Sequence, residues 1–154
     1  MNKYYAGIGS RKTPPRVLAK MSQISKALEA KGYCLRSGGA QGADTAFFNG
    51  CKNLWEIFGH RHSTPEAEAY VSEYHPAWER CNAFARRLHG RNAQIIMGEK
   101  LDKPVDFVVC WTPKGAMTGG TATGISMAQV NSIPVYNIAK REDYLALREM
   151  FKGL

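Results

Sequence analysis

Short apolar runs alternate along the chain with longer stretches in which apolar residues recur at helical spacing. The short runs predict β-strands at residues 3–9, 33–36, 54–58, 106–111 and 133–137. The longer stretches predict helices at residues 15–31, 43–51, 65–73, 76–89, 90–98, 121–130 and 141–151. We place a break before Pro76, because the residue that precedes a proline avoids the helical region.

The alternation of strands and helices indicates the fold class. The run 106–111 is apolar throughout after its first residue, which is typical of a parallel strand buried on both faces. We therefore expect an α/β fold: a single Rossmann-like doubly wound, mostly parallel sheet of about five strands with helices on both faces. Because the sequence has no linker, repeat or low-complexity tract, we assign residues 1–154 to one domain.

Composition narrows the class of protein. The 154 residues are 44% hydrophobic and 22% charged, which is ordinary for a globular domain. No apolar run approaches the roughly 20 residues that span a bilayer, and the first residues lack the apolar core of a signal peptide. The sequence thus predicts a cytoplasmic protein with no membrane partner.

The sequence predicts no metal site. Its four cysteines are far apart and form no Cys-x-x-Cys pair, so we interpret them as reduced thiols that pack as small hydrophobes. His60 and His62 flank Arg61 in a predicted loop without a neighbouring carboxylate or cysteine. That pattern favours a solvated or phosphate-facing loop over a pair of metal ligands.

A formal net charge of +8 favours partners that carry phosphate, although a solvated basic surface would give the same number. The placement of the glycines separates these two interpretations. Glycine-containing turns follow three predicted strands, at Gly9-Ser10-Arg11, at 37–42 and at 117–121. The second turn also opens a helix, whose positive end and free N–H groups favour an anion.

In an open parallel sheet these turns converge if the first and fourth strands straddle the point where strand order reverses. The hypothesis is a phosphate site; the competing interpretation is a set of ordinary tight turns. The turn sequences match neither a dinucleotide fingerprint nor a P-loop, so no cofactor is expected. The candidate phosphate-binding residues are Gly9, Ser10, Arg11, Arg36, Ser37, Gly38, Gly39, Gly42, Asp44, Arg91, Asn92, Lys114, Thr118, Gly119, Gly120 and Thr121.

Three of these motifs resemble a known family. Gly9-Ser10-Arg11, the stretch 37–44 and the stretch 91–96 look like the Rossmann-like domain of DprA/Smf, which loads recombinase onto single-stranded DNA. More broadly, the chain is similar to the SLOG superfamily, which includes LOG-type nucleotide phosphoribohydrolases. The resemblance covers almost the whole chain with the motifs in the same order.

The resemblance implies that Ser10, Arg11, Ser37, Arg91 and Asn92 line a basic phosphate pocket, and that the protein forms a homodimer. The chain lacks the helical and winged-helix modules that flank this domain in DprA, and the family's Arg-Asn-Arg run is shorter by one arginine. Without those modules, a recombinase-loading role is in doubt.

The comparison with LOG enzymes bears on catalysis. Their Pro-Gly-Gly-x-Gly-Thr-x-x-Glu motif corresponds here to the stretch 118–126, which keeps glycines but has no carboxylate. We therefore lean against an enzyme and assign no catalytic residue. A hydrolase would need another carboxylate, for which Asp44 and Glu99 are the nearest candidates, and Asp44 alternatively only stabilises a helix start.

The sequence leaves three hypotheses for function. The first, which we favour, is a nucleotide- or nucleic-acid-phosphate-binding domain. The second is a single-stranded DNA binder in recombination or DNA processing, and the third is a LOG-like nucleotide N-glycosidase. The expected partner is a nucleotide, a nucleotide-derived small molecule, or single-stranded DNA.

Overall fold

The computed structural model describes residues 3–152 of the chain. It confirms an α/β fold built on a five-stranded, all-parallel sheet in the order β3-β2-β1-β4-β5. This arrangement is compatible with Rossmann-like folds. The strands are β1 (Lys3–Gly7), β2 (Tyr33–Ser37), β3 (Trp55–Ile57), β4 (Phe107–Cys110) and β5 (Val135–Asn137).

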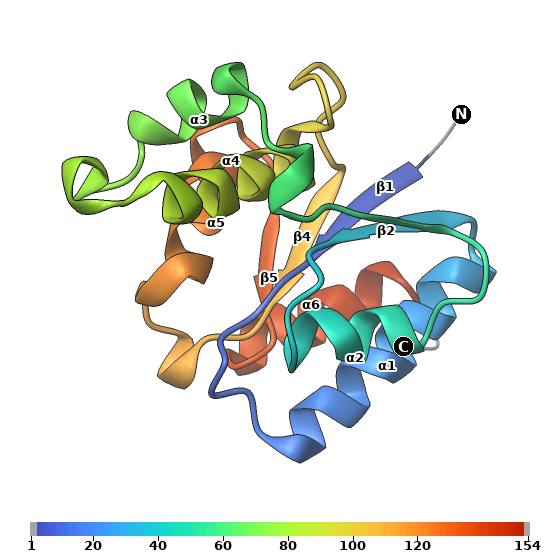
Figure 1. Cartoon of the computed structure of the whole chain (residues 1–154). Coiled ribbons are helices and arrows are strands. Elements are labelled where there is room, and N and C mark those ends of the chain that lie inside the picture. Colours follow the sequence, from blue (N-terminus) through green and yellow to red (C-terminus); the bar gives the residue numbers. More distant parts are fainter. Residues whose placement is uncertain (1–2, 153–154) are drawn as a thin grey trace.

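Helices cover both faces of this sheet (Figure 1). One face carries the helices α1 (Pro15–Ala30), α2 (Ala43–Asn49) and α6 (Arg141–Met150). The other face carries α3 (Pro65–Ser72), α4 (Ala83–Met97) and α5 (Gly119–Val130). Three short 3-10 turns complete the described elements: η1 (His60–His62), η2 (Trp78–Arg80) and η3 (Pro113–Gly115).

The central strands β1 and β4 divide their side chains between the two layers. Phe107 and Val109 pack with α1, α2 and α6, whereas Val108 and Cys110 pack with the other three helices. All four are nearly or fully buried. This follows from the alternation of side chains along a strand, and it explains why β4 appears in the sequence as a continuous apolar run.

The middle of the chain differs from the sequence prediction. Two helices were expected at 76–89 and 90–98, but the structure has one helix, α4, that runs through Gly90 and begins after the η2 turn. Asn82 starts it by accepting the backbone N–H of Ala85 at 2.8 Å. Gly90 lies inside the helix at a position where a Cβ would come within 2.1 Å of Ser63 Oγ, so the close packing there requires glycine. It is therefore a packing glycine, not a helix end.

Smaller differences concern the ends of elements. The first strand ends at Gly7 instead of Gly9, and β3 is three residues long instead of five. The predicted loop at 59–64 contains the η1 turn. Among the helices of residues 3–152, none combines the length and the hydropathy needed to cross a bilayer.

The strand order determines where a ligand can enter. β1 lies between β2 and β4, so the chain builds the sheet in one direction and then crosses β1 to build in the other. The loops that leave β1 and β4 therefore diverge at their carboxyl ends. In open α/β sheets the crevice at such a reversal is the usual ligand site.

Candidate functional site

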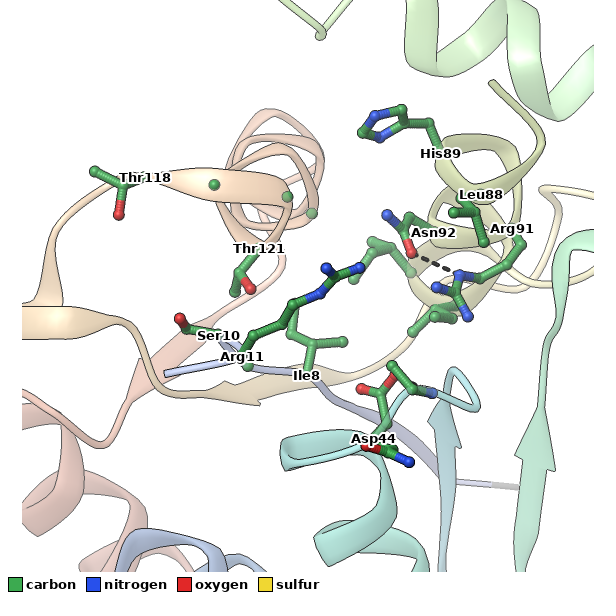
Figure 2. Close-up of a pocket in the computed structure, with 18 of the residues that line it drawn as sticks. Ile8, Ser10, Arg11, Asp44, Leu88, His89, Arg91, Asn92, Thr118 and Thr121 are labelled. Atoms are coloured by element: carbon green, nitrogen blue, oxygen red, sulfur yellow. Dashed lines mark hydrogen bonds between the residues drawn. The ribbon is translucent and has the colours of Figure 1, made fainter. Parts of the chain in front are cut away.

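A cleft of about 440 Å³ opens at this reversal. Loops after β1, β2 and β4 all contribute to its wall, and α4 closes the remaining side (Figure 2). The sequence-predicted residues on this lining are Gly9, Ser10, Arg11, Asp44, Arg91, Asn92, Thr118, Gly119, Gly120 and Thr121.

The start of α5 offers the cleft a set of backbone donors. The first N–H groups of a helix have no acceptor within the helix, and they include those of Gly119, Gly120 and Thr121. The side chain of the preceding residue, Thr118, makes no capping hydrogen bond with any described residue. The positive end of a 12-residue helix therefore faces the cleft uncapped.

The loop after β1 supplies a cation on a rigid turn. Ser10 Oγ accepts the backbone N–H of Lys12 at 3.1 Å, and the Ser10 carbonyl accepts the backbone N–H and the hydroxyl of Thr13. The N–H of Ser10 itself donates to the Trp111 carbonyl at 3.0 Å. These bonds leave few free amides in the turn, so its main contribution is the Arg11 side chain, which extends into the space between α5 and α4 (Figure 2).

Arg91 is the second cation of the cleft and is held by two contacts. Its Nε donates to Asn92 Oδ1 at 2.9 Å, and its Nη1 donates to the Phe58 carbonyl at 3.1 Å. These contacts use two of the five guanidinium N–H groups. Burial lowers the pKa of Arg91, and nearby Asp44 opposes that shift, so the guanidinium is a partly desolvated cation. Removal from water strengthens its attraction to an anion.

Asp44 stands opposite α5, at the start of α2 (Figure 2). One carboxylate oxygen accepts the Ser37 hydroxyl at 3.1 Å, and the other accepts the Ala40 backbone N–H at 3.2 Å. Burial raises the pKa of Asp44, although these hydrogen bonds and the charge of Arg91 act in the opposite direction. Within the described chain, Asp44 is the sole carboxylate among the residues that line the cleft.

The glycine turn after β2 thus differs from a free anion cradle. Asp44 already occupies the Ala40 N–H, and its charge lies at the positive end of α2. Ser37 is buried, and its single hydroxyl proton faces two acceptors, the Gly7 carbonyl at 2.5 Å and Asp44 Oδ1 at 3.1 Å, so it is shared between them. Gly38 and Gly39 line a separate, smaller cavity, while Gly42 precedes α2 and does not line either cavity.

Two predicted phosphate ligands lie away from the cleft. Arg36 is in the body of β2, 2% exposed, where its Nε pairs with Glu56 at 2.8 Å. It also donates to the Lys103 carbonyl and lies over the Tyr4 ring, so packing and ion pairing within the sheet explain its presence. Lys114 is exposed in η3 and does not line the cleft.

Sequence reasoning missed one wall of the cleft. Ala85, Leu88, His89 and Ile95 line it from α4, together with Arg91 and Asn92. The spacing 85, 88, 89, 92 and 95 marks one face of a continuous helix. That signal was present in the sequence, but the predicted break at residue 90 divided it between two helices.

The other candidates for chemistry lie elsewhere. Glu99 is exposed and does not line the cleft. His60 lies against the Phe84 ring, and His62 Nδ1 accepts the Gly59 N–H at 2.9 Å. The arrangement as a whole offers Arg11 and helix N–H groups on one side, and on the other a single carboxylate, Asp44, with Arg91 beside it.

Comparison with protein-family models, with curated proteins and with solved structures found no match for this chain.

Proposed function

We propose that this protein binds a nucleotide through its phosphate at the cleft above β1 and β4. The observation that carries the proposal is the uncapped start of α5, which faces the cleft together with Arg11 and Arg91. Backbone N–H groups at a helix start and guanidinium groups are the donors that phosphate prefers. A volume of about 440 Å³ also suits a ligand of mononucleotide size.

The charge distribution orients the ligand. The phosphate lies against α5 and Arg11, away from the Asp44 carboxylate. The opposite end of the ligand then faces Asp44, which accepts a hydrogen bond from a sugar hydroxyl or a base amino group. Leu88 and Ile95 supply the apolar surface against which a base lies. This places phosphate on the α5 turn instead of the glycine turn after β2.

The resemblance to the SLOG superfamily and DprA supports the same class of ligand. Of the residues that carry the resemblance, Ser10, Arg11, Arg91 and Asn92 line one cleft although they are far apart in sequence. The resemblance also underlies our proposal that the protein forms a homodimer, whereas the proposal that it acts in the cytoplasm rests on the sequence pattern alone. Light scattering after size exclusion measures the oligomeric state directly.

Exchange of Arg11 for alanine tests the phosphate site. Arg11→Ala should weaken binding of a nucleoside monophosphate by about 1–3 kcal/mol, because a charge-assisted hydrogen bond is lost. The control is Arg16→Ala, which removes an exposed arginine of α1 outside the cleft lining. Isothermal titration calorimetry gives both affinities. Equal affinities for Arg11→Ala and Arg16→Ala would contradict the proposed phosphate position.

Single-stranded DNA is the second candidate ligand, and the net charge of +8 favours it. Arg11 and Lys12 are exposed at the cleft, where they could contact successive phosphates of a strand. A strand would use the same α5 seat for one phosphate. Binding of an oligonucleotide with an affinity above that of the mononucleotide would favour this candidate.

A nucleotide N-glycosidase is the third candidate, and the observation in its favour is Asp44. It is a carboxylate in the cleft whose pKa is raised by burial, as in many general acids. The stretch 118–126 nevertheless lacks the glutamate of the LOG motif. Release of free base from nucleoside monophosphates, abolished in Asp44→Asn, would establish this activity.

A further inference from the structure

A cluster of three side chains lies beside the cleft, between α3 and α4. One ring nitrogen each of His75 and His89 and the sulfur of Cys81 lie within 4.8 Å of one another. His75 follows α3, Cys81 ends the η2 turn and His89 is in the middle of α4. This cluster was not predicted from the sequence, because its spacing of six and eight residues matches no common metal motif.

We propose that His75, Cys81 and His89 bind a thiophilic divalent cation, Zn²⁺ by the chemistry of the ligand set, at the rim of the cleft. One thiolate and two imidazoles are ligands that zinc prefers, and three protein ligands leave a fourth position for water or another oxygen donor. The proposal does not depend on the nucleotide function, since it concerns other side chains and its test uses the metal alone.

The distances are close to those of a zinc site. Cys81 Sγ and His75 Nε2 are 4.0 Å apart. Ligand atoms of a tetrahedral site with ordinary zinc bonds are about 3.3–3.6 Å apart, so the cluster must contract by less than about 1.5 Å. The two imidazole rings are already neighbours, with centroids 4.4 Å apart.

One ring nitrogen of His89 has no partner in the described part of the chain. This atom, Nδ1, is also buried. Buried polar atoms are usually paired, so an unpaired ring nitrogen is an observation that a ligand would explain.

The surroundings hold two of the ligands in place. The N–H of Cys81 donates to the Trp78 carbonyl at 3.0 Å, which fixes the η2 turn. The Trp78 ring lies 6.1 Å from each of the two histidine rings and shields the cluster on one side. His89 also lines the cleft. A bound ion would therefore add positive charge at the rim of the cleft.

Two contacts must change when the ion binds, and the first is the hydrogen bond from the Cys81 thiol to the Ala77 carbonyl at 3.6 Å, since the thiol must lose its proton. In the second, the Ala77 N–H donates to His75 Nδ1 at 3.0 Å, so the neutral ring carries its proton on Nε2, facing Cys81. An ion that binds Nε2 displaces this proton, and the ring proton then belongs on Nδ1, opposite the Ala77 N–H. Residues 75–77 must turn to relieve that contact, so the Ala77 amide is a reporter of binding.

Titration of the chelator-treated protein with Co²⁺, followed by displacement with Zn²⁺, tests the proposal. We expect one equivalent of Co²⁺, with thiolate charge-transfer absorption and the intense visible bands of a tetrahedral site. Cys81→Ser and His89→Gln should each lower the affinity at least about tenfold. The matched controls Cys51→Ser and His60→Gln change a thiol and an imidazole outside the cluster and should bind as the wild type does.

Two further measurements do not depend on the variants. Zn²⁺ should shift the Ala77 amide resonance, and it should protect Cys81 but not Cys51 from alkylation, as read by mass spectrometry of the peptides. Absence of stoichiometric binding overturns the proposal. So does Co²⁺ absorption that survives in both Cys81→Ser and His89→Gln, or equal alkylation of Cys81 with and without Zn²⁺.

Discussion

Gly38 shows how a residue outside the cleft lining affects two charged side chains that belong to it. It follows β2 directly and has no side chain to separate Arg91 from Asp44. A Cβ at Gly38 would lie 2.3 Å from Arg91 Nη1 and 2.7 Å from Asp44 Oδ2. The two charged side chains can approach one another only across this glycine.

Gly38→Ala should therefore displace the Arg91 and Asp44 side chains and lower the free energy of unfolding by about 1–3 kcal/mol, the usual cost of overpacking. The control is Gly39→Ala, since a Cβ at Gly39 meets nothing within 4 Å. Its effect should stay within about 0.5 kcal/mol. Urea unfolding of both variants measures the difference. Equal stabilities would mean that the side chains adjust without cost.

Asp44 predicts a pH dependence of stability. Its pKa in the folded protein lies above the ordinary value of 3.8, so the native state holds the proton more tightly than the unfolded chain does. Stability contributed by protonated Asp44 is thus complete below pH 3.8 and is lost as the pH rises through the folded pKa. As the pH rises from 3.8 through the folded pKa, the free energy of unfolding of the wild type should therefore fall relative to that of Asp44→Asn.

Urea unfolding of both proteins at a series of pH values that starts below 3.8 measures this shift. The acidic end of the series is the internal control, because both side chains are neutral there. If the free energy of unfolding of the wild type instead rises relative to that of Asp44→Asn as the pH rises, the prediction is wrong. The hydrogen bonds from Ser37 and Ala40 would then outweigh the cost of burying the charge.

At the scale of elements, the sequence predicted strands better than it predicted the middle helices. The strands are short and mostly apolar runs, and the pattern is clearest in β4, which is buried along its whole length as expected of a central parallel strand. The helix through Gly90 was missed because glycine usually weakens a helix, and its packing reason, the contact with Ser63, is a tertiary one. Arg36 was predicted to bind phosphate for a similar reason, because its ion pair with Glu56 on the next strand forms only in the folded chain.

Glu29 connects α1 to the segment that leads into β3. This residue of α1 accepts backbone N–H groups from three consecutive residues, Lys52, Asn53 and Leu54, at 2.9–3.1 Å. Burial alone would raise the pKa of Glu29, but these hydrogen bonds outweigh it and leave the pKa below its usual 4.5. The carboxylate therefore positions the chain that leads into β3.

Glu29→Gln should lower the free energy of unfolding by about 0.5–1 kcal/mol at neutral pH, the low end for such bonds because the carboxylate is open to solvent. The folded pKa of Glu29 is lowered, so its stabilisation is present above pH 4.5 and is lost as the pH falls through the folded pKa. Glu149→Gln, at an exposed position of α6, is the control. Thermal unfolding at neutral and acidic pH should show a deficit for Glu29→Gln that disappears in acid.

For the whole molecule, topology converts distant motifs into one site. The strand order alone brings the loops after β1, β2 and β4 to one edge, and this consequence was predictable once the strands were recognised. What the sequence did not reveal is the division of charge within the cleft. That division depends on hydrogen bonds, such as the one from Ala40 to Asp44, that form only in the folded chain.

The salt dependence of binding is the property of the whole molecule that separates a nucleotide from a DNA strand. A chain of charge +8 attracts any polyphosphate at low salt, so affinity at one salt concentration does not identify the ligand. The logarithm of the affinity for single-stranded DNA falls with the logarithm of salt by about 0.7 per phosphate neutralised.

We expect a mononucleotide held at the α5 seat to lose little affinity between about 50 and 200 mM salt, whereas an oligothymidylate loses affinity steeply over the same range. Fluorescence anisotropy with labelled forms of both ligands measures the two slopes. If the oligonucleotide remains the tighter ligand at the higher salt, the cleft is one phosphate position of a longer DNA-binding surface and the mononucleotide assignment is wrong.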